Sequence, residues 1–148
     1  GKQWILSSWF AAADCEIALH AGRYAETIER AQALLPKLQA EGEFLSEMVT
    51  ARALAVARAV HEPGSTFAPI DECIRALTET GNLMEAARTH LWGSWAALQR
   101  GDRARAQHHV ELALRQFQHS GCGYAHGEAQ RLAECIAASP PSAAAADK

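Results

Sequence analysis

Apolar residues recur every three or four positions along most of this chain, and glycine or proline interrupts the recurrence between segments. This spacing places apolar side chains on one face of an amphipathic α-helix. Alanine is abundant and β-branched residues are few, which also favours helix. The pattern predicts helices over residues 3–21, 24–35, 43–60, 66–80, 83–100, 103–117 and 124–138. Pro36 predicts a kink, or a new short turn, before Gly42.

The clearest pair of predicted helices lies between Leu83 and Phe117. Asn82 and Glu85 have the spacing of a capping box, in which the two side chains satisfy free backbone N–H groups. Gly101 is expected to adopt the left-handed conformation that ends a helix, and Asp102 is expected to cap the next one. Each helix of this hairpin carries its own apolar stripe, so the hairpin needs similar neighbours to bury both.

The same hairpin pattern recurs along the chain. Ala18, Ala59 and Ala97 align in one column, with spacings near 40 residues. A period of this length with two helices per unit is typical of an α-solenoid. Chance alignment of alanine-rich helices is the alternative explanation. The repeat predicts one helical-repeat domain over residues 1–138, with hairpins at about 3–41, 43–80 and 82–120, a terminal helix at 124–138 and a disordered tail at 139–148.

Composition narrows the class of protein further. A net charge of −3 with interspersed signs argues against a nucleic-acid surface, which requires a basic stripe. No apolar run approaches the roughly 20 residues of a membrane span, and no secretory signal opens the chain. The four cysteines have no paired spacing, which favours reduced thiols and a cytoplasmic location. The chain begins Gly1-Lys2 rather than with Met, so we expect a fragment.

Three features of the chain carry a family resemblance. They are small residues at the expected helix crossings, glycine at the turns, and an aromatic residue that opens the second helix. These residues are Ala18, Ala59, Ala97, Ala106, Ala113, Gly22, Gly101, Tyr24 and Phe67. In them the chain resembles the tetratricopeptide-repeat (TPR) family, in its longer-period variety found in large bacterial signalling ATPases and transcription activators. The resemblance implies an all-α fold, a right-handed superhelix of three hairpins with a C-terminal capping helix.

The resemblance also implies where a partner binds. In this family the first helix of each hairpin lines the concave face, which here would present Trp9, Glu16, His20, Thr50, His61, Arg88, Trp95 and Gln99. Trp9 and Trp95 are equally consistent with core positions. Aromatic anchors beside polar groups suit a peptide or a partner helix. The implied function is a non-catalytic scaffold for protein–protein or interdomain contacts within a larger bacterial signalling or transcription regulator. The alternative is an effector-sensing domain that binds a small ligand in the same groove.

Candidate chemistry is sparse. His108 and His109 are adjacent on a predicted helix, so their side chains diverge and cannot chelate one ion. His119, Cys122 and His126 have metal-like spacing, but they supply only three ligands and no fourth lies nearby in sequence. We therefore expect no catalytic residue, no cofactor and no metal, and hence no enzyme.

The first predicted helix differs from the others because its apolar residues are too many for one stripe. They are Trp4, Ile5, Leu6, Trp9 and Phe10. An exposed apolar patch of this kind marks an interaction site. We expect a neighbouring repeat or domain to cover it, or the helix to mediate self-association.

Overall fold

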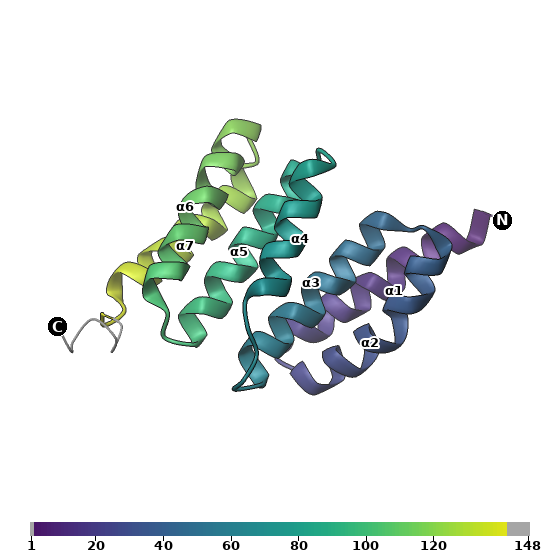
Figure 1. Ribbon diagram of the computed structural model, residues 1–148. Helices are drawn as coiled ribbons and strands as arrows, with labels where there is room; N and C mark the ends of the chain where they lie inside the picture. Colours follow the sequence, from purple (N-terminus) through teal and green to yellow (C-terminus); the bar gives the residue numbers. More distant parts are fainter. Residues whose placement is uncertain (1, 142–148) are drawn as a thin grey trace. The chain divides into compact units, whose positions relative to one another are not determined.

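The computed structural model describes residues 2–141, with side chains from residue 6 onward, and over these residues the chain is all-helical with no strand (Figure 1). The helices are α1 (Lys2–His20), α2 (Tyr24–Glu41), α3 (Phe44–His61), α4 (Ala68–Glu79), α5 (Leu83–Gln99), α6 (Arg103–Ser120) and α7 (Gly123–Ala138). The all-α prediction is confirmed, and the helix boundaries lie close to those expected. Most of the predicted tail, residues 142–148, lies outside the described residues.

The turn between α5 and α6 forms as its sequence predicts. Gly101 has a φ of +75°, a conformation that residues with a Cβ rarely adopt. The side chain of Asp102 then accepts a hydrogen bond from the backbone N–H of Arg105 at 3.0 Å, which caps α6. Together these residues end one helix and start the next within a short connection.

Two local predictions are wrong. The side chain of Asn82 does not cap α5, because its Nδ2 donates instead to Thr80 Oγ1 at 2.9 Å. The second helix does not end at residue 35 and no new turn starts at Pro36, since α2 continues through it to Glu41, and a kink within the helix stays a prediction. A proline removes only one backbone donor from the helix, and the fully buried Leu38 anchors the following turn. Tertiary packing therefore overrides the local signal in α2.

The chain divides into two compact units, residues 1–73 and 74–148, and the boundary falls inside α4. In the first unit, α3 packs against both α1 and α2, and α1 also packs against α2. The buried apolar residues of α1 and α2 are Ala12, Cys15, Ala18, Leu19, Ala31 and Leu38. The small alanine and cysteine side chains among them let the helices approach closely.

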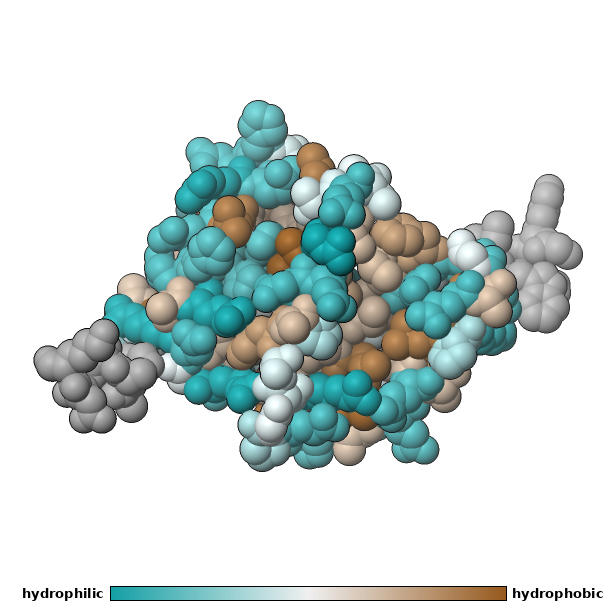
Figure 2. All heavy atoms as spheres, in the orientation of Figure 1, coloured by the Kyte–Doolittle hydropathy of each residue, from teal (hydrophilic) through white to brown (hydrophobic). Residues whose placement is uncertain are grey.

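The second unit repeats this order of packing. Helix α5 packs against α6, α6 packs against α7, and α5 also contacts α7. The buried apolar residues of α6 and α7 are Ala106, Val110, Ala113, Phe117, Ala125, Ala129 and Ile136. Exposed positions of α6 such as Gln107, Glu111 and Arg115 are polar, and the corresponding part of Figure 2 is mainly hydrophilic.

Candidate functional site

Helix α1 buries one face within the first unit. Ser8, Ala12, Cys15 and Leu19 are all buried, and they follow one another at intervals of four, three and four residues. That spacing places them on one side of the helix, against α2 and α3. Burial raises the pKa of the Cys15 thiol, as expected of an inert core cysteine.

The opposite side of α1 is also apolar, and it is exposed. Leu6, Phe10, Ala13 and Ile17 have the same four-three-four spacing, displaced to the far side of the helix. The exposed fractions are 59 % for Leu6, 62 % for Phe10 and 58 % for Ile17, while Trp9 beside them is 42 % exposed. We call these five residues the α1 outer face. The side chains of Trp4 and Ile5, predicted to extend this surface, lie outside the described residues.

Two acidic residues border the α1 outer face. Asp14 is exposed on one edge, and Glu16 is partly buried on the other. Glu16 Oε1 accepts a 2.6 Å bond from Arg52 Nη2 on α3. The Arg52 side chain is only 2 % exposed, whereas that of Glu16 is 27 % exposed. Glu16 is therefore largely neutralised within the unit, and Asp14 carries the charge that a partner would meet.

The predicted concave residues of the first unit separate into different environments. Trp9 and His20 are exposed on α1, and His61 is exposed at the end of α3, where its ring centroid lies 6.2 Å from that of Tyr24. Thr50 is fully buried, and its hydroxyl donates to the Ser46 carbonyl at 2.8 Å. Thr50 therefore cannot contact a partner, because its side chain serves α3 itself.

The remaining predicted residues lie on α5. Arg88 is exposed and bonds to Glu85 at 3.0 Å, and Gln99 is exposed near the end of the helix. Trp95 is partly buried, with its ring edge-on to Trp92 at a centroid distance of 5.6 Å. This edge-on geometry is typical of paired aromatic side chains.

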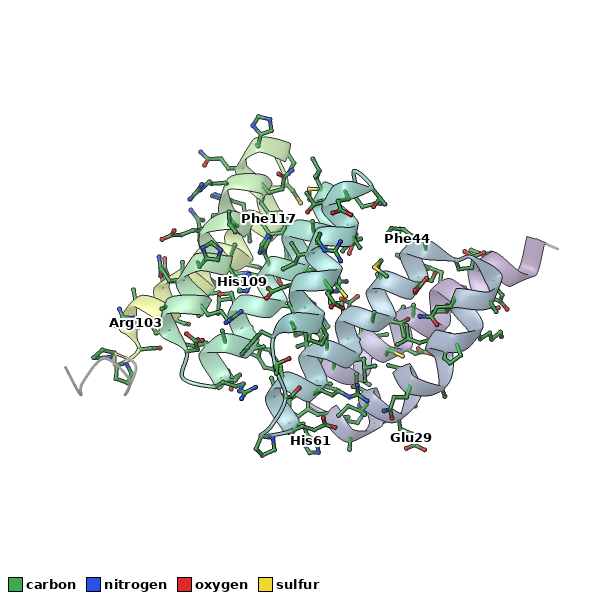
Figure 3. The ribbon with its side chains drawn as sticks, viewed as in Figure 1. Glu29, Phe44, His61, Arg103, His109 and Phe117 are labelled. Atoms are coloured by element: carbon green, nitrogen blue, oxygen red, sulfur yellow. The ribbon has the colours of Figure 1, made fainter. Side chains whose placement is uncertain are left out.

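A histidine pair between α5 and α6 is absent from the sequence prediction. The Nδ1 atoms of His90 and His109 lie 2.9 Å apart, so one ring donates and the other accepts. Figure 3 labels His109 on α6. The pKa of His90 is lowered to about 4, mainly by burial and also by charge repulsion from the neighbouring His109 and His108. Beside the pair, Ser94 Oγ donates to the Ala106 carbonyl at 2.7 Å. The pair is thus a polar contact within the hairpin.

Metal-binding geometry is not found in residues 2–141, where no three His, Cys, Asp or Glu side chains converge as ligands. His119 is exposed, while Cys122 and His126 are partly buried at the turn into α7. Over the same residues, no helix combines the length and apolar character needed to cross a membrane. Comparison of the chain with protein-family models, curated proteins and solved structures finds no match.

Proposed function

We propose that this chain is a non-catalytic helical-repeat scaffold that binds a helical segment of another protein or domain through the α1 outer face. The observation that carries the proposal is the two-sided character of α1. One side packs within the unit, and the other exposes Leu6, Phe10 and Ile17 in a continuous stripe. Exposed apolar patches of this kind mark interaction sites in soluble proteins.

The packing order within each unit supports the repeat architecture. Successive helices pair, and the first and third helices of each group also touch. An α-solenoid of the TPR type is built by continuing this order, since each hairpin contacts only its neighbours. A right-handed superhelix of such hairpins is therefore part of the proposal. In a solenoid, a terminal helix with an apolar outer side requires a further helical element to cover it.

The expected affinity follows from the exposed apolar area. Complete burial of a Leu, Ile or Phe side chain is worth about 1.5–3 kcal/mol. Three such residues, each more than half exposed, would therefore contribute roughly 4 kcal/mol from this side of the interface. A partner helix adds a similar amount, and association itself costs several kcal/mol. The balance of about 4–5 kcal/mol predicts a weak, reversible complex with a dissociation constant between about 0.1 and 1 mM.

A selection from a displayed library of helical peptides tests the proposal. The parent chain is the bait, and the variant Leu6→Ser/Phe10→Ser is used for counter-selection. Both residues are exposed, so the variant is expected to fold normally. The control Leu83→Ser/Tyr124→Ser removes exposed apolar residues from the second unit. Peptides retained by the parent and the control, but not by the variant, support the proposal. A selection that enriches no such peptide contradicts it.

A further inference from the structure

We infer that the α1 outer face receives an amphipathic helix with apolar residues at heptad spacing and basic residues along its edges, and not a second copy of this chain. The inference rests on the proposed function and specifies the chemistry of the partner. It follows from two properties of α1, namely the spacing of its exposed apolar residues and the sign of the charge beside them.

The spacing identifies a helix as the occupant. Leu6, Phe10, Ala13 and Ile17 are separated by four, three and four residues, which is the spacing of the core positions in a coiled coil. Large side chains on both sides of Ala13 can interlock with those of a facing helix, and the small side chain of Ala13 lets the two backbones approach. An extended peptide would match this pattern poorly, since its side chains alternate every two residues.

The charge identifies the edges of the partner. Between Leu6 and His20, α1 carries Asp14 and Glu16 and neither Lys nor Arg. Glu16 is engaged by the buried Arg52, so the exposed carboxylate that α1 itself places beside the outer face is that of Asp14. Residues flanking the core positions of paired helices select partners by charge. A partner with Lys or Arg opposite Asp14 is therefore favoured over one with Glu.

The same charge disfavours a second copy. In an antiparallel two-fold pairing centred on Ala13, equivalent edges meet, so Asp14 of one copy would lie close to Asp14 of the other. This antiparallel arrangement brings two exposed carboxylates together without a basic residue of α1 between Leu6 and His20 to compensate. In a parallel pairing, the edge carrying Asp14 would face the edge carrying Glu16, where the repulsion is smaller because Arg52 engages Glu16.

Two synthetic peptides test the inference directly. Both are designed helices with identical apolar residues at heptad spacing, one with Lys and the other with Glu at the flanking positions, each labelled with fluorescein for anisotropy. At about 50 mM salt we expect the Lys peptide to bind the parent chain about threefold to tenfold more tightly than the Glu peptide. The preference should shrink at 0.5 M salt, because the charges are exposed.

Variants separate the apolar and the charged contributions. Asp14→Lys should reverse the preference between the two peptides, whereas Glu29→Lys, an exposed charge reversal on α2, should leave it nearly unchanged. Phe10→Ser should weaken both peptides at least tenfold. Circular dichroism melts confirm that each variant is folded.

The outcomes distinguish this inference from the proposed function. Suppose that both peptides bind the parent chain with equal affinity, that Asp14→Lys leaves both affinities unchanged, and that Phe10→Ser abolishes binding of both. The inference about charge is then overturned, while the helix-binding function stands. If neither peptide binds, both proposals fail. If sedimentation shows a dimer of the parent chain that Phe10→Ser disrupts, a second copy occupies the face and the inference is wrong.

Discussion

At the scale of single residues, the ion pair between Arg52 and Glu16 has two unequal members. The guanidinium of Arg52 is almost completely buried, whereas the Glu16 carboxylate retains contact with water. Removing an acceptor from a buried charge is more destabilising than removing the partner of a charge that can turn toward solvent. The two residues therefore differ in what their removal leaves behind.

This asymmetry predicts the effect of matched substitutions. Glu16→Met removes one acceptor of the buried guanidinium and should lower the free energy of unfolding by about 2 kcal/mol, the usual range for a hydrogen bond to a charged group. Arg52→Met leaves Glu16 able to reach water and should lower it by about 1 kcal/mol. Urea unfolding of the two variants and the parent measures the difference. If the two variants lose equal free energy of unfolding, or if Arg52→Met loses more, the prediction is wrong.

The histidine pair predicts a pH dependence of stability. In the folded chain the pKa of His90 is lowered to about 4, below its ordinary value of 6.5. Between these values the unfolded chain binds a proton that the folded chain does not, so stability is complete above pH 6.5 and declines as the pH falls toward 4. The expected decline from this residue is on the order of 2 kcal/mol.

Urea unfolding between pH 4 and pH 7.5 tests this dependence. His90→Gln should flatten the decline, because glutamine does not titrate. His119→Gln replaces an exposed histidine of the same unit and should keep the slope of the parent. A slope that His90→Gln leaves unchanged would rule out His90 as its source.

The histidine pair also shows what sequence reasoning lacks at this scale. His90 and His109 lie at similar distances from the turn at Gly101, as do Ser94 and Ala106, which also share a hydrogen bond. In an antiparallel hairpin such residues face each other, so the turn position could have identified the pair. The burial of Thr50, in contrast, could not be worked out from a turn position. It depends on how neighbouring helices pack against α3.

At the scale of helices, two N-cap residues of similar chemistry behave differently. Asp102 accepts a backbone hydrogen bond, whereas the Asn82 side chain turns away to Thr80. Asp102→Ala should therefore lower the free energy of unfolding by about 1 kcal/mol, the usual effect of losing a side-chain cap. Asn82→Ala should have a smaller effect. Urea midpoints compare the variants, and a larger loss for Asn82→Ala would contradict the observed cap geometry.

Helix positions were largely predictable because the relevant signals are local. Apolar periodicity and the turn at Gly101 depend on neighbours within a few residues, and the observed boundaries follow them. The end of the second helix and the cap at Asn82 were mispredicted because contacts outside the local segment decide them. Leu38 secures the turn after Pro36 by burial, and Thr80 offers Asn82 an alternative partner.

At the scale of the whole molecule, the sequence indicates that α1 has more apolar residues than one stripe can hold. The structure adds which of them are buried and which are exposed, and this distinction carries the proposed function. The residues predicted for the concave face do not separate buried from exposed positions in this way. They include Thr50, which is buried, and Trp95, whose ring contacts that of Trp92. The surface proposed for binding thus shares Trp9 with that prediction but consists mainly of other residues.

The most direct test of this account is to map the binding surface by NMR on the complete chain. The Lys peptide is titrated into labelled protein, and backbone amide shifts are followed residue by residue. We predict that the largest changes lie on α1 between Leu6 and His20, and that they disappear in Phe10→Ser. Changes centred instead on Arg88, Trp95 and Gln99, or no changes at saturating peptide, would contradict the assignment of α1 as the binding helix.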